Sequence, residues 1–182
     1  IVLFTIMIVL AVKIVNNKVK RILFVGRLIE RKGLEYLIRA LPAISKEIDA
    51  KVIIIGDGEE MQRLKKLSAD LRVEKKVEFL GKVSNQKLAQ EYQDCDVFVL
   101  PAIIDSKGDT EGLGIVLIEA SLYKKPIVAS KVGGIVDVIK DGKTGFLVKE
   151  KDEKDLAGRI VSVLKNIREA EKVGKRVYKF VK

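Results

Sequence analysis

The sequence contains no histidine and no tryptophan, and its only cysteine is Cys95. Without histidine, the chain lacks the most common general base and the most common zinc ligand of proteins. A single cysteine excludes an internal disulfide and fits a reducing compartment, so we expect a cytoplasmic protein. Any chemistry in this chain must therefore use carboxylates, cations and backbone dipoles, or a histidine from another chain.

Aromatic residues are also scarce, at 5%, whereas 35 Lys and Arg residues face 25 Asp and Glu residues and give a formal net charge of +10. A basic surface suits a polyanionic partner, which can be nucleic acid, anionic lipid or a phosphorylated ligand. The basic residues are spread along the chain without interleaved aromatic residues, so the stacking pattern of RNA-binding proteins is missing. We therefore expect no nucleic-acid partner.

Long hydrophobic runs are missing as well. The apolar stretch Ile1–Val12 is interrupted by Thr5 and is shorter than the roughly 20 residues that a membrane span needs. A signal peptide would carry positive charge before this stretch and small residues after it, and neither is present. We interpret residues 1–20 as a leftover strand or an interdomain linker, with a short membrane-surface anchor as the alternative.

Six short apolar runs alternate with amphipathic stretches, and several runs are continuously apolar, as in strands covered on both faces. The pattern predicts an α/β fold: a Rossmann-like three-layer α/β/α domain with a mostly parallel sheet of about six strands. Right-handed crossovers would place every strand-to-helix loop at one edge of the sheet, where ligands of such sheets bind. The predicted strands are Ile22–Val25, Val52–Ile55, Val77–Leu80, Val97–Leu100, Ile127–Ala129 and Phe146–Val148.

We expect the domain to span residues 21–168 and a basic helical tail to span residues 169–182, with its charges on a solvated face. In the helix predicted from Leu34, Pro42 should bend or end the helix. A later helical pattern places Glu119 on the same face as its apolar neighbours Ile115, Ile118 and Leu122. If this face points inward, the Glu119 carboxylate needs a partner. The alternative to a ligand-binding role is therefore a buried salt bridge between Glu119 and a Lys or Arg.

The loop after the first strand, from Gly26 to Gly33, carries Arg27 and Lys32 and opens the next helix. Two cations beside the exposed backbone N–H groups of a helix N-terminus suit a diphosphate. The same residues also fit a solvated basic turn.

The loop after the fourth strand is the most informative, because it ends in Glu111-Gly112-Leu113-Gly114 before the next helix. The glycines allow a ligand to approach the backbone closely. Glu119 follows Glu111 by eight residues, which would be about 12 Å along the axis if the intervening stretch were all helical. One extended ligand could then contact both carboxylates at different points.

Two further loops have an open interpretation. Gly81-Lys82-Val83-Ser84 follows the third strand, and its backbone could bind the edge of a nucleobase, with Ser84 as a helix N-cap. Gly133-Gly134 follows the fifth strand and could cradle an anion, although an ordinary tight turn is the preferred interpretation of these glycines alone.

Two motifs are false leads. Gly56 and Gly58 begin a dinucleotide-binding fingerprint, but Met61 stands at its third glycine position, which disfavours an NAD-dependent enzyme. Asp94 and Asp96 form a D-x-D motif, which chelates metal in some glycosyltransferases. Asp96 would lie at the amino end of a strand, on the edge opposite the ligand loops, so we expect no metal site.

Taken together, the loops resemble glycosyltransferase family 4 (glycosyl transferases group 1) of the GT-B fold. The similarity runs from about Arg21 to about Leu164. Its specificity lies in the combination of motifs: the basic loop, two glutamates eight residues apart, a double-glycine loop and a D-G-x-x-G-F-L-V stretch. The matching segments are RILFVGRLIERKGLEYLIRAL, KVIIIGDGEEMQRL, KVEFLGKVS, CDVFVLPAIIDSKGDTEGLGIVLIEA and KPIVASKVGGIVDVIKDGKTGFLV.

The resemblance implies roles for four side chains. Arg27 and Lys32 would bind the donor diphosphate, Glu111 would contact the hydroxyls of the donor sugar, and Glu119 would bind the ribose hydroxyls. Of these, Arg27, Lys32 and Glu111 would act in catalysis.

Backbone positions would complete the donor site. The N–H groups of Gly112, Leu113 and Gly114 would face the sugar and phosphate, Gly26 would belong to the diphosphate loop, and Gly81 and Val83 would flank the base.

The resemblance implies the donor-binding half of a retaining glycosyltransferase, acting in polysaccharide or glycoconjugate biosynthesis. It would move a sugar from a UDP- or GDP-linked donor to a glycan or lipid-linked acceptor, with no metal or other cofactor, by front-face displacement. Cations would stabilise the leaving diphosphate. The alternative is a non-catalytic nucleotide-sugar-binding module or a subunit of a split transferase.

The first twenty residues do not resemble the family's N-terminal domain, which binds the acceptor and often supplies a catalytic histidine. We therefore expect the missing N-terminal domain or a partner chain as a partner, peripheral contact with the inner face of the membrane, and weak activity for this chain alone.

Overall fold

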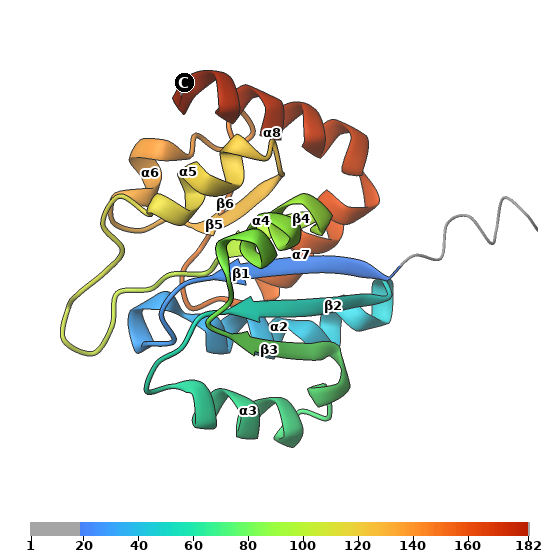
Figure 1. Ribbon diagram of the computed structural model, residues 1–182, viewed down its shortest axis with the longest axis vertical. Coiled ribbons are helices and arrows are strands. Elements are labelled where there is room, and N and C mark those ends of the chain that lie inside the picture. Colours follow the sequence, from blue (N-terminus) through green and yellow to red (C-terminus); the bar gives the residue numbers. More distant parts are fainter. Residues whose placement is uncertain (1–18, 182) are drawn as a thin grey trace, which may run out of the picture.

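The computed structural model describes residues 19–181, so most of the apolar segment over residues 1–20 lies outside the described residues. The described chain forms a three-layer α/β/α fold around a six-stranded parallel sheet with the order β3-β2-β1-β4-β5-β6 (Figure 1). All six predicted strands and the predicted fold class are confirmed. The strands are β1 (Lys20–Val25), β2 (Ala50–Ile55), β3 (Val77–Gly81), β4 (Val97–Leu100), β5 (Ile127–Ser130) and β6 (Phe146–Val148).

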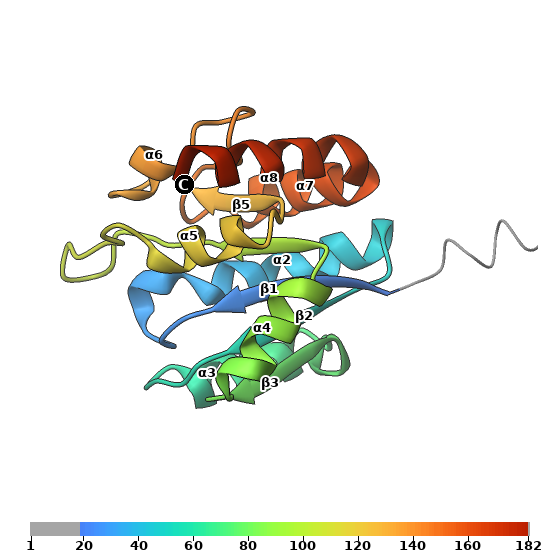
Figure 2. The ribbon, with the colours of Figure 1, turned by 45° about the horizontal axis from the view of Figure 1, so that its top comes forward.

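Helices cover both faces of the sheet. One face carries α2, α3 and α7, which are in contact through α2, and the other carries α4, α5 and α8 (Figures 1 and 2). The α-helices are α2 (Leu34–Glu47), α3 (Met61–Asp70), α4 (Asn85–Asp94), α5 (Ile115–Leu122), α6 (Ile135–Val138), α7 (Glu153–Lys165) and α8 (Ile167–Val181), with the 3₁₀ turns η1 (Glu30–Lys32) and η2 (Glu74–Lys76).

The central strands are apolar on both faces because both faces are covered. Ile22, Leu23 and Phe24 of β1 and all four residues of β4 are completely buried. Each such side chain contributes about 1.5–3 kcal/mol through removal of apolar surface from water. The sheet is therefore a rigid support for the loops at its edge.

Proline does not end α2, contrary to one of the two outcomes expected at Pro42. The helix continues for five residues to Glu47, although Pro42 has no N–H to donate to the carbonyl four residues earlier. Leu41 and Ile44, on either side of Pro42, are completely buried. Their burial outweighs the roughly 3 kcal/mol that an interior proline costs a helix.

The inward face of α5 was predicted wrongly. Ile115 and Leu122 are 67% and 53% exposed, whereas Leu117, Ala120 and Ser121 are completely buried. The helix is apolar almost all round, so its periodicity alone does not select a face. Its orientation is set by β5 on one side and by α8 on the other.

The C-terminal basic stretch is a helix with one packed side. In α8, Ala170 and Val173 are buried, and Gly174 passes so close to the Lys124 and Lys125 carbonyls that a side chain would collide with them. The charged residues of α8 from Arg168 to Arg176 are exposed, as expected for a solvated face.

The strand order reverses direction between β1 and β4. These strands are neighbours, yet the chain leaves β1 toward β2 and leaves β4 toward β5. Their carboxyl ends lie at the left of Figure 1, where the long loop between β4 and α5 projects. Ligands of open parallel sheets bind at such a switch point.

Candidate functional site

The two loops at the switch point pack directly on each other. Gly33 has a left-handed backbone (φ 62°), and a Cβ there would collide with the carbonyl of Pro101, which directly follows β4. The Ile103 N–H also donates to the Arg31 carbonyl at 2.9 Å. Only glycine meets both demands at position 33, so the Lys32-Gly33 sequence sets how closely the loops approach.

Lys32 and Glu111 meet across these loops. The Lys32 Nζ, from η1, donates to Glu111 Oε2, from the end of the β4–α5 loop. Their side chains are only 12% and 11% exposed. No pattern in the sequence predicted a contact between these two residues. The structure brings them together as an ion pair that is largely shielded from water.

Arg27 lies on the same loop as Lys32 but is in a different state. It follows Gly26 directly after β1 and is exposed. Within the described part of the chain its guanidinium makes no hydrogen bond or ion pair. Arg27 is therefore available to an anionic ligand, whereas Lys32 already has a carboxylate partner.

The backbone around Glu111 is held by the double glycine. A Cβ on Gly133 would collide with the Glu111 carbonyl and one on Gly134 with the Gly112 carbonyl, and the Gly134 N–H donates to the Glu111 carbonyl at 3.1 Å. Gly133-Gly134 thus makes room for the neighbouring loop. The tight turn predicted for these two glycines is confirmed, because they form a turn directly before α6.

Gly112 and Leu113 present open backbone at the start of α5. Neither residue takes part in a hydrogen bond within residues 19–181, and Leu113 is 58% exposed. Gly114 is the N-cap of α5, with φ 66°. The N–H groups of Gly112 and Leu113, just before this N-cap, are available to donate to an anion or a hydroxyl oxygen.

Glu119 is the fifth residue of α5, and residues 111–114 are not helical, so the all-helical spacing from Glu111 does not apply. Its partner is also not a Lys or Arg. The Tyr92 hydroxyl of α4 donates to Glu119 Oε2 at 2.8 Å. Among the described residues, no hydrogen bond or ion pair joins Glu119 to the Lys32–Glu111 pair.

Tyr92 is a candidate site residue that the sequence did not reveal. It is 1% exposed and stacks on Tyr123 with ring centroids 5.2 Å apart. Burial, together with the hydrogen bond to Glu119, raises the pKa of Tyr92 well above its ordinary value. The hydroxyl therefore stays protonated and fixes the Glu119 carboxylate. The sequence signal was only its helical spacing, which predicted core packing.

Two other glutamates anchor the long β4–α5 loop and were also missed. Glu30 accepts hydrogen bonds from the Ser106 hydroxyl at 2.7 Å and the Ser106 N–H at 3.1 Å. Glu150, after β6, accepts from the Ile104 N–H at 2.7 Å. These contacts join segments more than 45 residues apart, which no local pattern indicates.

The proposed base loop lies further along the edge. Gly81 ends β3, two strands from β1, which is about 10 Å at normal strand spacing. It has φ 65°, and its carbonyl accepts from the Gly56 N–H at 2.9 Å. Val83 is partly buried against the core. The loop shares the ligand edge, but within residues 19–181 no hydrogen bond or ion pair joins it to the Lys32–Glu111 pair.

The dinucleotide-like glycines have a structural role. A Cβ on Gly56 would collide with the Gly26 carbonyl and one on Gly58 with the Leu28 carbonyl. The Leu28 N–H donates to the Asp57 carbonyl at 2.9 Å. The first loop therefore occupies the space over these glycines that a dinucleotide pyrophosphate would need.

The D-x-D motif lies at the opposite edge, as predicted. Asp96 directly precedes β4 and accepts from the Arg21 N–H at 2.8 Å and the Lys20 Nζ at 3.2 Å, both at the start of β1. Among the described residues no group of three or more Asp, Glu or Cys side chains is placed to hold a metal ion.

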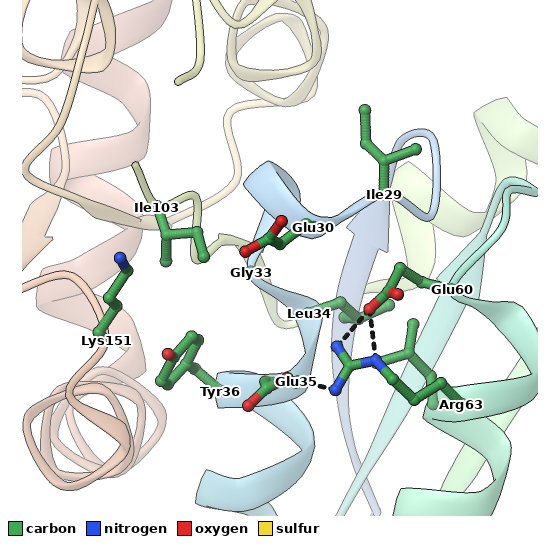
Figure 3. Close-up of a pocket in the computed structure, with 11 residues that line it drawn as sticks. Ile29, Glu30, Gly33, Leu34, Glu35, Tyr36, Glu60, Arg63, Ile103 and Lys151 are labelled. Atoms are coloured by element: carbon green, nitrogen blue, oxygen red, sulfur yellow. Dashed lines mark hydrogen bonds and ion pairs between the residues drawn. The ribbon is translucent and has the colours of Figure 1, made fainter. Parts of the chain in front are cut away.

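A cavity of about 250 Å³ lies on the flank formed by α2 and α3 (Figure 3). Three of its charged groups are paired with one another, because the Arg63 guanidinium binds both Glu60 and Glu35. Tyr36 and Lys151 line the opposite side. The cavity shares Gly33 and Ile103 with the switch-point loops, but none of the four predicted side chains lines it.

The chain belongs to the family of glycosyl transferases group 1, whose family model matches residues 10–180. This match extends beyond the Arg21–Leu164 similarity at both ends.

Curated relatives include an uncharacterized glycosyltransferase of Methanocaldococcus jannaschii, 40% identical over 82% of this chain and 37% of the relative. Another is the GDP-mannose-dependent α-(1-6)-phosphatidylinositol monomannoside mannosyltransferase of Mycolicibacterium smegmatis, 35% identical over 82% of this chain and 40% of the relative. The chain thus spans about two fifths of the length of these relatives.

Solved structures support the fold. Sucrose-phosphate synthase of Thermosynechococcus elongatus matches with a TM-score of 0.80 and 28% identity over 94% of this chain and 42% of that chain. The HepE protein of Anabaena, in complex with UDP, matches with a TM-score of 0.80 and 24% identity over 94% of this chain and 46% of that chain.

Within residues 19–181, no helix has both the length and the apolar character that crossing a membrane requires.

Proposed function

We propose that this chain is the donor-binding half of a retaining glycosyltransferase that transfers a sugar from a nucleotide-sugar. The observation that carries the proposal is the Lys32–Glu111 contact at the switch point, with the exposed Arg27 on the same loop as Lys32. The cations Arg27 and Lys32 bind the diphosphate of the donor, and the Glu111 carboxylate accepts hydrogen bonds from the sugar hydroxyls. Membership of the glycosyl transferases group 1 supports the assignment, with family 4 as the finer placement.

The proposed chemistry is electrostatic. Arg27 and Lys32 stabilise the charge that develops on the leaving diphosphate, and the open N–H groups of Gly112 and Leu113 add fixed dipoles. In front-face displacement, the leaving diphosphate stays on the acceptor's side and takes the acceptor's proton. The chain itself has no histidine to act as a base.

Glu119 is proposed to bind the ribose, and Gly81 and Val83 to flank the base. The donor is proposed to be UDP- or GDP-linked. A curated relative is named as GDP-mannose-dependent, and the Anabaena HepE structure contains UDP.

Transfer itself is proposed to need an N-terminal acceptor-binding domain or partner chain, because the relatives are more than twice as long as the matched segment. We propose a cytoplasmic location with peripheral contact to the membrane's inner face.

A thermal-shift panel of UDP-, GDP- and ADP-sugars tests the proposal directly. A ligand that binds only the folded state raises its stability, so at least one UDP- or GDP-sugar should raise the Tm. EDTA should leave the shift unchanged, since the proposed site uses no metal. A panel without any shift at millimolar ligand would contradict the proposal.

Charge removal should then localise the binding. Arg27→Ala and Lys32→Ala should each weaken nucleoside diphosphate binding by about 1.5–3 kcal/mol, the usual loss for a charge-assisted hydrogen bond. Lys66→Ala is the matched control, because Lys66 is exposed on α3 away from the switch point. Titration calorimetry measures all three variants, and equal affinities would reject the diphosphate loop.

A further inference from the structure

In the unliganded site, Lys32 is already neutralised by the protein. Its ammonium and the Glu111 carboxylate form one ion pair, and both side chains are nearly nine-tenths shielded from water. In the described residues, neither side chain has a second charged partner. The carboxylate therefore occupies the position that a phosphate oxygen of the proposed donor needs.

An arriving diphosphate meets a conflict at this position. If it takes Lys32, the Glu111 carboxylate loses its counter-ion and lies beside a second anion. A largely buried charge without a partner is strongly unfavourable. The Glu111 backbone has little freedom to retreat, because Gly133 and Gly134 pack against its carbonyl and that of Gly112.

The sugar of the donor resolves the conflict. Sugar hydroxyls are hydrogen-bond donors, and a carboxylate accepts from them through strong, charge-assisted bonds. The hydroxyls of a nucleotide-sugar can thus replace Lys32 as the hydrogen-bond donor to the Glu111 carboxylate. A bare nucleoside diphosphate has no sugar at this position and cannot do so.

We propose that Glu111 exchanges partners between Lys32 and the donor sugar, and thereby makes the site discriminate against the nucleoside diphosphate product. This inference rests on the proposed function and deepens it. The site discriminates because the Glu111 carboxylate lacks a partner in the complex with the nucleoside diphosphate, and not because the nucleotide-sugar makes an additional contact. Glu111 then speeds product release as well as recognising the donor.

The test compares Glu111→Gln with the wild type in calorimetric titrations of UDP against UDP-glucose and of GDP against GDP-mannose. The glutamine keeps the size of the side chain but removes its charge, so Lys32 becomes free for phosphate. We expect the nucleoside diphosphate to bind Glu111→Gln at least about tenfold more tightly than it binds the wild type. The sugar nucleotide should bind the variant no more tightly than the wild type. Unchanged or weaker diphosphate binding would overturn the inference.

Two further variants separate exchange from simple charge repulsion. In a Lys32→Ala background, Glu111→Gln should give little of this gain, because the competing pair no longer exists. A gain that persists in full in that background overturns the exchange. Glu47→Gln is the charge-matched control, since it breaks the exposed Glu47–Lys165 pair near the far end of α2 and should change neither affinity.

The same titrations distinguish failure of the inference from failure of the proposed function. If the wild type binds none of the four ligands, both are overturned; if it binds them but Glu111→Gln gives no tighter diphosphate complex, only the exchange is overturned. Thermal unfolding of each unliganded variant establishes that it is folded, and Glu111→Ala should show the same diphosphate gain.

Discussion

At the scale of single residues, the partner of each charged group decides what that group can do. Arg27 is exposed and without a partner in the described chain, Lys32 is held by Glu111, and Glu119 is held by Tyr92. The sequence indicated Arg27, Lys32 and Glu111 because they lie in loops after strands, and Glu119 because it follows Glu111 by eight residues and through the family resemblance. Neither the Lys32–Glu111 pairing nor the Tyr92 contact was predicted, because both depend on packing between distant segments.

Tyr92→Phe should weaken nucleotide binding through Glu119. The change removes the hydroxyl that orients the carboxylate while keeping the ring stack with Tyr123. We expect a loss of about 1 kcal/mol in UDP or GDP affinity. Binding of a bare sugar phosphate, which has no ribose, should be unaffected. An equal loss for both ligands would mean that Tyr92 acts only on the fold. Tyr36→Phe, on α2, is the matched control.

Cys95 should make stability fall at high pH. Burial raises the pKa of its thiol to about 12, from an ordinary value of 9.0. Since the folded pKa is the higher one, this stability is fully present below pH 9 and is lost as the pH rises toward 12. The free energy of unfolding should fall by about 1.4 kcal/mol per pH unit from this group.

Urea titrations between pH 8 and 11 measure this effect. Cys95→Ala should show a shallower decline than the wild type, and parallel curves would contradict the assignment. Tyr92 contributes a decline of the same sign above pH 10, because its pKa is also raised by burial.

At the scale of elements, the strands were predictable and one helix orientation was not. Continuous apolar runs identify buried strands such as β4, which lies between Asp96 and Pro101 and whose bounds were predicted without error. In α5, apolar residues surround the axis, so the choice of inward face depends on α8, nearly fifty residues later. Likewise, the turn at Gly133-Gly134 was predicted, but its close packing against the Glu111 backbone was not, because that packing is a tertiary contact.

Gly134→Ala should therefore disturb the site more than its turn geometry suggests. Gly134 has an ordinary φ of −74°, so alanine causes no backbone strain, but its Cβ would collide with the Gly112 carbonyl. We expect a loss of about 1–3 kcal/mol in unfolding free energy and weaker nucleotide binding.

The opposite result is expected at Gly158, which lies within α7 with open space around its Cβ position. Gly158→Ala should stabilise the protein by about 0.5–1 kcal/mol. Urea unfolding of both variants checks the pair, and a neutral Gly134→Ala would contradict the proposed loop packing.

At the scale of the whole molecule, the strand order creates the site. Because β1 and β4 are neighbours whose connections diverge, their loops meet at one edge and bring together residues 79 positions apart, Lys32 and Glu111. The alternation of strands and helices predicted this edge, since parallel order and right-handed crossovers determine it. The identity of base, sugar and acceptor has no such topological origin.

The most direct measurement is a titration of the ¹⁵N-labelled chain with UDP-glucose and GDP-mannose, followed by amide chemical shifts. We expect one donor to change the amide chemical shifts of Arg27, Gly112, Leu113 and Glu119 together, with a single affinity. Shifts confined to the α2–α3 cavity around Glu35 and Arg63, or to the opposite edge around Asp96, would contradict it.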